Sequence, residues 1–337
     1  MGTVSALELA RRGRRVVVLE RSVPGAEASS AAAGILGAQL EAHGPGEEAD
    51  LLLASRALYP GFAAALEDES GVSVGYRRCG GLRVCAPGVR REVELAVAWQ
   101  RERGLPVELP SAPVEEAISE SFAQAVRFVE DGQIDPPRLF AAASVAAARA
   151  GVEFRAGAEV RRVIVERERA TGVALGGGEV LSCPDVVLAA GSWSSLVAGA
   201  AVDDVRPVRG QIVELGLRAP LFSHVVLGPG AYLVPRADGR VLVGSTMERV
   251  GFEKRVTAGA VRDLLDAALA IVPGLRDATL LGSWASFRPH SASGPRIGAS
   301  GIAGLTLATG HHRNGILLAP LTGRRVADAV TGAAPSA

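Results

Sequence analysis

Cysteine is scarce in this chain of 337 residues, which contains only Cys79, Cys85 and Cys183. Their spacing fits neither a disulfide framework nor the paired motifs of a metal site, so we predict no bound metal. Unpaired thiols are typical of proteins in a reducing compartment, and we therefore expect the protein in the cytoplasm.

An excess of charge of one sign is also missing. Lysine plus arginine and aspartate plus glutamate both number 36, which gives no reason to expect nucleic acid or an anionic membrane as a partner. No apolar run is long enough to span a bilayer, and the first residues form a charged amphipathic pattern instead of a signal peptide. The 48% of apolar residues indicate a globular protein, whose length suits two domains or one large α/β domain with insertions.

A helix followed by a buried strand opens the chain. Val4 to Gly13 has helical periodicity and a glycine stop, and Arg14 to Glu20 is an apolar strand that ends in an acid. This order is typical of the second half of a dinucleotide-binding βαβ unit, in which the acid binds a ribose. Gly2 then takes the place of the last glycine of the Gly-x-Gly-x-x-Gly turn, so we expect the natural N-terminus to be missing. An ordinary amphipathic hairpin is the alternative.

Hydrophobic periodicity predicts helices and strands over most of the remaining chain. Helices are expected over residues 47–70, 90–103, 138–150 and 257–271. Strands are expected over residues 76–84, 126–128, 152–155, 159–163, 185–189, 207–214, 232–236, 240–247, 283–289 and 304–310. The turn at 133–137 indicates a crossing between domains, and the strand at 185–189 ends in a small-residue turn of the kind that binds ligands in parallel sheets.

Two segments rich in glycine have features of a ligand site. Residues 310–320 indicate a turn with two histidines and an arginine that runs into an apolar helix, and such a helix start attracts an anion or an electron-rich ring edge. A plain helix start with Asn314 as its N-cap is the alternative. Residues 27–38 are small enough to let a ligand approach the backbone, although an alanine-rich helix is the simpler alternative.

Five blocks of sequence carry a family resemblance. They are AAAGILGA at 31–38, YLVPR at 232–236, VGSTM at 243–247, SFRP at 286–289 with GPRIG at 294–298, and GHHRNGILLAP at 310–320. In this order the blocks resemble the flavin-dependent amino-acid oxidase family, which includes D-amino-acid, sarcosine and glycine oxidases. The glycine oxidases of thiamine biosynthesis are the most similar group, and the blocks span nearly the whole chain.

This resemblance implies an α/β fold in which a Rossmann-like FAD-binding domain, with its first strand truncated, carries a β-rich α+β substrate domain. The FAD-binding domain would comprise residues 1–76, 136–208 and 286–337, and the substrate domain residues 77–135 and 209–285. FAD would be bound non-covalently, because no cysteine lies in the C-terminal flavin region where sarcosine oxidases attach theirs.

The resemblance also implies which residues bind the cofactor. Glu20 and Arg21 would meet the adenosine ribose, and Val160 would meet the adenine through its backbone. The other cofactor residues would surround the diphosphate and the flavin ring, and they are Gly2, Ser29, Ser30, Ala33, Gly34, Ile35, Gly191, His311, His312, Arg313, Asn314, Gly315, Ile316 and Leu317.

Tyr232, Arg288 and Arg313 would form the catalytic and substrate-binding site, with Met247 beside them. Arginine holds a carboxylate through two parallel hydrogen bonds, which suits an amino-acid substrate. Hydride transfer from Cα to a flavin needs little from the protein beyond positioning, a neutral amine and exclusion of water. As alternatives, the arginines could form surface ion pairs, Tyr232 could be a core strand residue, and Met247 could fill space.

The implied activity is oxidative deamination of glycine, or of a small amine such as sarcosine or a D-amino acid, with formation of hydrogen peroxide. The partners would be the amino acid and oxygen, and a homo-oligomer is compatible with this role. A related FAD-dependent dehydrogenase with another acceptor, and a flavin-free non-catalytic protein, are the alternatives that the sequence leaves open.

Overall fold

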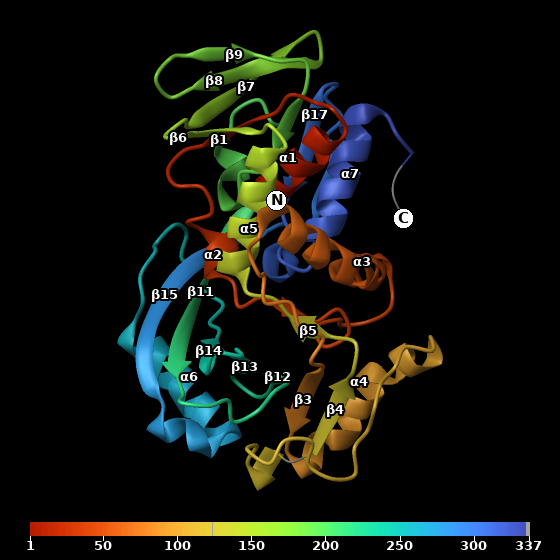
Figure 1. Ribbon diagram of the computed structural model, residues 1–337, viewed down its shortest axis with the longest axis vertical. Coiled ribbons are helices and arrows are strands. Elements are labelled where there is room, and N and C mark those ends of the chain that lie inside the picture. The colour runs from red at the N-terminus through yellow and green to blue at the C-terminus, as the bar shows by residue number, and fades with distance from the viewer. Residues whose placement is uncertain (123, 335–337) are drawn as a thin grey trace.

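The computed structural model describes residues 1–122 and 124–334. Parallel strands and their helices occupy the upper part of Figure 1, and a large, mostly antiparallel sheet occupies the lower part. This architecture confirms the predicted α/β fold with a β-rich portion, whereas the division into five chain segments stays a prediction. Among the described residues, no helix is long and apolar enough to cross a membrane.

Short parallel strands form the centre of the upper region. They pair as β1 (Val17–Glu20) with β6 (Glu153–Ala156) and β10 (Val186–Leu188) with β17 (Leu305–Thr309), and β16 (Arg296–Ala299) runs antiparallel to β17. Arg14 and Asp185, which precede β1 and β10, form an ion pair of 3.6 Å, and Leu19 and Val186 share one apolar cluster. The two pairs therefore lie beside each other. Among the described residues, no strand of one pair is hydrogen-bonded to a strand of the other.

Seven strands form the large sheet of the lower region. In spatial order they are β15 (Thr279–His290), β11 (Arg206–Gly216), β14 (Arg240–Gly244), β13 (Tyr232–Pro235), β12 (Val225–Leu227), β3 (Gly81–Cys85) and β4 (Gln124–Phe128). The neighbouring strands are antiparallel except for β12 and β3. Helix α6 (Ala258–Ile271) packs against β11 and β14, and its Leu264 and Ile271 enter the same apolar core as Val213 and Val243 of the sheet.

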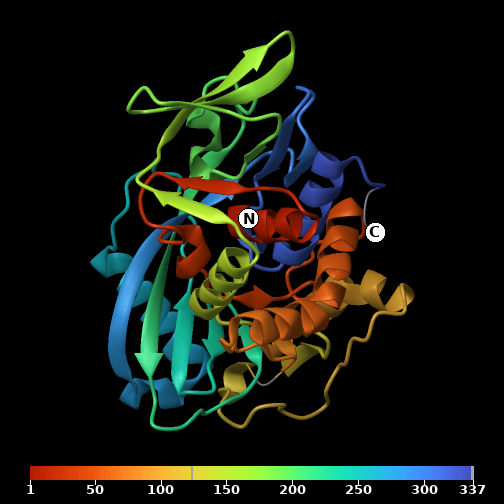
Figure 2. The same ribbon diagram turned by 45° about the horizontal axis from the view of Figure 1, so that its top comes forward.

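Four helices pack against one another beside the parallel strands, as Figure 2 shows. They are α1 (Gly2–Arg11), α3 (Glu47–Ser70), α5 (Pro136–Arg149) and α7 (Ala319–Thr331). The remaining elements are α2 (Ala28–Ala31), α4 (Arg90–Glu102), β2 (Ile35–Leu36), β5 (Gly132–Gln133), β7 (Val160–Glu166), β8 (Arg169–Leu175), β9 (Val180–Ser182) and the 3-10 turns η1 (Pro87–Val89), η2 (Glu120–Phe122), η3 (Gly191–Leu196), η4 (Pro273–Asp277) and η5 (His312–Asn314).

The start of the C-terminal helix differs from the prediction. The alternative with Asn314 as the N-cap of a helix is wrong, because α7 begins at Ala319. Pro320 has no N–H to donate to the carbonyl of Ile316 four residues earlier, so the helix cannot include that bond. The Tyr59 hydroxyl of α3 and the Ala319 N–H donate to this carbonyl instead. Asn314 is therefore not the N-cap of a helix, and residues 312–318 form a short 3-10 turn followed by further turns.

Candidate active site

Arg288 and Tyr232 approach each other over the face of the large sheet. Arg288 lies on β15 and its guanidinium extends over Gly210 of β11, where an added Cβ would overlap it. Tyr232 lies on β13 and its ring covers Gly244 of β14, where an added Cβ would overlap the ring in the same way. Since β11 and β14 are neighbours between these strands, the two glycines clear a path along which the guanidinium and the phenol converge.

Arg288 is held by the residues that follow β14. One terminal nitrogen donates to the carbonyl oxygen of Thr246 at 3.1 Å, and the other donates to the Ser245 hydroxyl. Burial lowers the pKa of Arg288, and the charge of Arg313 lowers this pKa further. An arginine remains charged even so. The structure thus presents a desolvated, fixed cation, which is the kind of group that binds a carboxylate.

Arg313 is a second cation on the same side of the sheet. It belongs to η5, and its Nε donates to Glu41 Oε2 at 3.0 Å. One of its terminal nitrogens lies 3.6 Å from the sulfur of Met247. Glu41 raises the pKa of Arg313, so the ion pair fixes the positive charge. The structure therefore brings together Tyr232, Met247, Arg288 and Arg313, the four residues predicted to contact the substrate.

The turn around His312 lies next to these cations. His312 has a φ of 47°, a left-handed conformation that is strained for a residue other than glycine. Its ring meets that of His290 edge to face, with 4.9 Å between the ring centres. Burial, then the charges of His290 and of nearby arginines, lower the pKa of His312 to about 4. The imidazole is therefore neutral at pH 7.

The carbonyls beyond this turn are bound by helix α3. Tyr59 donates to the carbonyl of Ile316, and the Ser55 hydroxyl donates to the carbonyl of Leu317 at 2.7 Å. The backbone N–H groups of Ile316 and Leu317 make no hydrogen bond within the part of the chain that the structure describes. Both residues lie in or against an apolar core. Buried N–H groups need an acceptor, so this turn can bind a polar edge of a ligand.

His311 is buried within the same turn, and its Nε2 lies 3.0 Å from the Thr322 hydroxyl. Burial lowers its pKa to about 3. Because the unfolded chain protonates this residue near pH 6.5, its contribution to stability is complete above pH 6.5 and falls as the pH drops toward 3. We expect this residue alone to reduce the free energy of unfolding by about 2 kcal/mol at pH 5.

Urea unfolding of His311→Gln at pH 7.5 and pH 5.0 tests this expectation. The variant should lose less stability between the two pH values than the unaltered protein. His43→Gln is the matched control, because His43 is exposed and should leave the difference unchanged. Equal acid sensitivity of His311→Gln and the unaltered protein would show that His311 is not the source.

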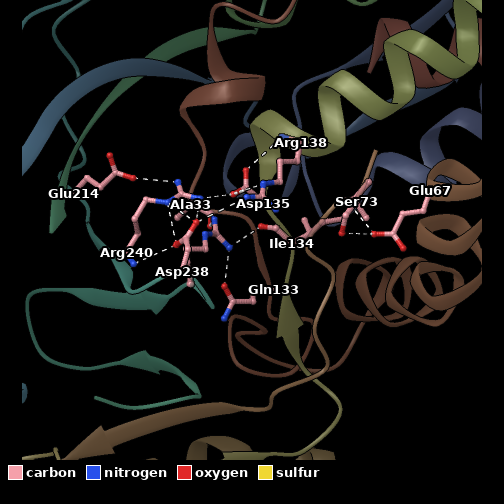
Figure 3. Close-up of polar contacts among 12 residues, drawn as sticks. Ala33, Glu67, Ser73, Gln133, Ile134, Asp135, Arg138, Glu214, Asp238 and Arg240 are labelled. Carbon is pink, nitrogen blue, oxygen red and sulfur yellow. Dashed lines mark hydrogen bonds and ion pairs between the residues drawn. The ribbon is translucent and has the colours of Figure 1, made fainter. Parts of the chain in front are cut away.

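A buried arginine fixes the segment that includes Ala33 and Gly34. Arg236, which follows β13, donates to the carbonyl oxygens of Ala33 at 2.7 Å and Ile134 at 2.9 Å, and to the Gln133 side chain at 2.7 Å. Figure 3 shows these three acceptors close to Asp135, Asp238 and Arg240. The network joins the α2–β2 segment of the upper region to the large sheet, so the positions of the two depend on each other.

Glycine is required at position 34. Its φ is 77°, and an added Cβ would overlap the carbonyl oxygen of Ile134. We expect Gly34→Ala to lower the free energy of unfolding by about 3 kcal/mol, because left-handed strain adds to a clash with fixed backbone. Gly37→Ala is the matched control, because the backbone of Gly37 is not in the left-handed region. A Cβ added there meets only side-chain atoms, at 3.1 to 3.5 Å. Urea denaturation of both should separate them, and equal stabilities would refute the steric argument.

The comparison with known proteins agrees with this arrangement. The family model described as FAD dependent oxidoreductase (DAO) matches residues 1–329. The chain belongs to this family. Within it, the glycine oxidase of Geobacillus kaustophilus (strain HTA426) is 35% identical over 98% of this chain and 90% of its own length. The bifunctional protein ThiO/ThiG of Trichormus variabilis (strain ATCC 29413 / PCC 7937) is 33% identical over 97% of this chain but only 51% of its own.

The fold agrees with that of a solved relative. A crystal structure of glycine oxidase from Geobacillus kaustophilus superimposes with a TM-score of 0.91 at 34% identity, covering 99% of this chain and 92% of the other. The predicted family and its FAD dependence are thereby confirmed.

The residues present fit FAD at the flavin end. The free N–H groups of Ile316 and Leu317 suit the oxygen and nitrogen acceptors of a flavin pyrimidine ring. Gly34, where a Cβ would meet the carbonyl oxygen of Ile134, lets the predicted cofactor segment Ala33–Ile35 pack closely against residues 134–136. Ser29 and Ser30 lie in α2, directly before this segment. Asn314 and Gly315 connect η5 to the two free N–H groups.

The residues expected at the adenosine end lie near the parallel strands. Glu20 ends β1, and its carboxylate accepts the Ser22 N–H at 3.0 Å. Val160 begins β7 and shares an apolar cluster with Leu19 of β1. A carboxylate at the end of the second strand is the usual partner of a ribose in a dinucleotide fold. Figure 1 shows β1 far from β13 and β14, as an extended cofactor would require.

Two further predicted cofactor residues flank the parallel strands. Gly2 begins α1, and an added Cβ would be in ordinary contact with Ala189, just after β10. Gly191 has a φ of 53°, and its carbonyl accepts hydrogen bonds from Ser194 at 2.8 Å and Thr309 at 3.2 Å. These bonds join the carboxyl ends of β10 and β17, which is the usual edge for a bound nucleotide.

Arg21 lies beside a loop of the β-rich region. Its guanidinium carbon is 3.7 Å from the ring centre of Trp193. The Trp193 ring also stacks on Phe252, with 5.0 Å between ring centres, and meets Phe287 edge to face. Phe252 belongs to the loop 245–257, which also carries Met247. Lys254 of this loop forms an ion pair of 2.8 Å with Glu27. The loop is thus attached to both ends of the segment between β1 and α2.

Four residues of the site were not predicted from the sequence. They are Glu41, Gly210, Arg236 and Gly244. Single glycines inside the predicted strands 207–214 and 240–247 were an available signal, because an isolated glycine in a strand often marks a close approach. Glu41 gave no local signal. Arg236 closes the YLVPR block, but nothing in that block indicates its partners, which are distant in the sequence.

Proposed function

We propose that this family member oxidises glycine, or an amino acid of similar size, to the corresponding imine, which water hydrolyses to the 2-oxo acid and ammonia. FAD, when bound, would supply the two-electron acceptor for oxidation at Cα, and its return to the oxidised form by oxygen would yield hydrogen peroxide. The observation that carries this proposal is the pairing of Arg288 and Tyr232 over Gly210 and Gly244. The glycine oxidase named above, 35% identical over nearly all of the chain, supports the choice of substrate.

The protein's own residues would bind and orient the substrate. Arg288 would hold the carboxylate with two parallel hydrogen bonds, and the Tyr232 hydroxyl would add a third. Fixing the carboxylate on a rigid sheet fixes Cα as well, and positioning of this kind supplies much of the acceleration in hydride transfer. Arg313 would add positive potential, reduced by its ion pair with Glu41.

We also propose the ligand contacts, the cellular location, the electron acceptor and the pathway that the sequence suggested. The residues named above would contact FAD and substrate, the protein would act in the cytoplasm with oxygen as acceptor, and its product would enter thiamine biosynthesis. Assembly as a homo-oligomer belongs to the same proposal.

The test is a peroxide assay on the flavin-loaded protein with glycine, sarcosine and D-alanine, together with anaerobic bleaching of the flavin absorbance by each. Glycine should bleach the flavin and produce peroxide in air. Bleaching without peroxide would indicate an acceptor other than oxygen. No bleaching with any of the three amines would refute the proposed substrate class.

A further inference from the structure

Glu41 is the acid of the candidate site. Its side chain is 12% exposed and its carboxylate pairs with Arg313 at 3.0 Å. Burial lowers the pKa of Arg288, and the negative charge of Glu41 opposes this by raising it. Glu41 therefore faces both cations that approach the substrate position, and it is not an acid on a solvated surface.

The backbone around Glu41 is fixed. The carboxylate of Asp131, 1% exposed, accepts the N–H groups of Gln39 at 3.1 Å and Leu40 at 2.7 Å. Arg83 donates to the carbonyl of Leu40 at 2.6 Å. These bonds fix the backbone that leads into Glu41, and the hydrogen bond from Arg313 Nε holds its carboxylate at the site.

The charges of the site leave room for one carboxylate. Glu41 is already the counter-ion of Arg313, and its charge also acts on Arg83, so Arg288 is the cation that remains for a substrate carboxylate. His312 adds no positive charge at pH 7, because its pKa is lowered to about 4 by burial and neighbouring cations. One substrate carboxylate can pair with Arg288. A second would lie close to Glu41 and compete with it for Arg313, and like charges at short range in a buried site repel strongly.

We propose that Glu41 is a specificity-determining residue that excludes amines with a second carboxylate by occupying Arg313. The substrate class would then be zwitterions with a single carboxylate, such as glycine and its N-alkyl derivatives. Dicarboxylates such as iminodiacetate and D-aspartate would be rejected. This inference rests on the proposed function only in placing the substrate carboxylate at Arg288. Selectivity would arise here from repulsion of the wrong ligand.

The experiment measures binding without turnover. Acetate and malonate carry one and two carboxylates and no amine, and isothermal titration of the flavin-loaded protein at pH 8 gives both dissociation constants. In Glu41→Gln the amide retains size and an acceptor for Arg313 but has no charge. We expect malonate to bind at least tenfold more tightly than in the unaltered protein, while the affinity for acetate changes less than threefold.

Two further variants separate charge from packing. Glu41→Asp retains the charge, and its ratio of acetate to malonate affinity should stay near that of the unaltered protein. Glu108→Gln is the matched control, because Glu108 pairs with Arg127 at 3.1 Å but is 51% exposed. An unchanged ratio in Glu41→Gln, or an equal rise in malonate affinity in Glu41→Asp, would overturn the inference. If Glu41→Gln does not fold, Arg313→Gln replaces it, and tighter malonate binding there would overturn the inference as well.

The binding experiment tests the role of Glu41 separately from the proposed catalytic activity. If the unaltered protein does not oxidise glycine but Glu41→Gln gains malonate affinity, the role of Glu41 stands and the proposed function fails. If glycine is oxidised and the affinity ratio does not move, only the role of Glu41 fails. With an active protein, the ratio of kcat/KM for iminodiacetate to that for glycine should rise at least tenfold in Glu41→Gln.

Discussion

Arg288→Ala should lower kcat/KM for glycine by about a thousandfold. Removing one partner of a buried, charge-assisted pair typically costs about 4 kcal/mol, which corresponds to that factor. The loss should appear mainly in KM, because the guanidinium binds the carboxylate in the ground state as well as in the transition state. Initial-rate kinetics with saturating oxygen measure both constants, and flavin absorbance should show that FAD is still bound.

Two other arginine variants define this result. Arg288→Lys restores a charge without the two parallel donors, so it should recover only part of the affinity. Arg262→Ala removes a 71% exposed side chain on α6 and should change nothing. If Arg288→Ala instead lost its flavin or melted at much lower temperature, Arg288 would be a structural residue bound to Ser245 and Thr246.

The glycine beneath the arginine gives an independent test. A methyl group at Gly210 would meet the guanidinium of Arg288, which could move away only by giving up its hydrogen bonds to Ser245 and Thr246. Gly210→Ala should therefore displace the guanidinium and lower kcat/KM at least tenfold, while the protein stays folded and retains its flavin. Gly282→Ala on the neighbouring strand β15 is the control, because no atom lies within 4 Å of a Cβ there. Full activity of Gly210→Ala would argue against the predicted position of the carboxylate.

Arg236→Met should lower the free energy of unfolding by about 4 kcal/mol. Arg236 is 6% exposed, and its loss leaves the carbonyls of Ala33 and Ile134 and the Gln133 side chain without a donor. Each buried acceptor left unsatisfied costs about 1 to 3 kcal/mol, partly offset by the cost of burying the cation itself. Burial lowers the pKa of this arginine to about 10, so it is still charged at pH 7.

The neighbouring Arg240 provides the comparison, because it contacts Asp135, Asp238 and Glu214 but is 31% exposed. Ion pairs near the surface contribute about 1 kcal/mol or less, so Arg240→Met should be the milder variant. Urea unfolding of both variants measures the difference. Proteolysis near Ala33 should also increase in Arg236→Met alone. Similar stabilities of the two variants would contradict the role given to the buried arginine.

Local sequence was sufficient for most elements of the fold. The predicted helix over 47–70 coincides with α3, and the helices expected at 90–103 and 257–271 are within one residue of α4 and α6. The error at Asn314 concerned where the last helix begins. Pro320 is a favourable first-turn residue and was an available signal for the later start. A hydroxyl from α3 decides the position, and that contact has no local signature.

The candidate site was predictable only in part. Residues such as Arg288 and Tyr232 belong to short sequence blocks that can be recognised in isolation. The partners that fix them cannot, since Arg313 and Glu41 are 272 positions apart and Ala33 and Arg236 are 203 apart. Arg296 shows the same limit, because its partner Asp204, at 3.2 Å, is 92 positions away. Ion pairs and hydrogen bonds between such distant residues form only when whole helices and strands pack together.

The ion pair between Lys254 and Glu27 has a practical consequence. Lys254 is the only lysine in the chain, and its side chain is 43% exposed. A reagent that couples to lysine would therefore attach at one point, on the loop that also carries Met247. Protein immobilised through lysine would be oriented uniformly, with this loop facing the support. Because acylation removes the charge of the lysine nitrogen, the labelled protein would also lose the ion pair with Glu27.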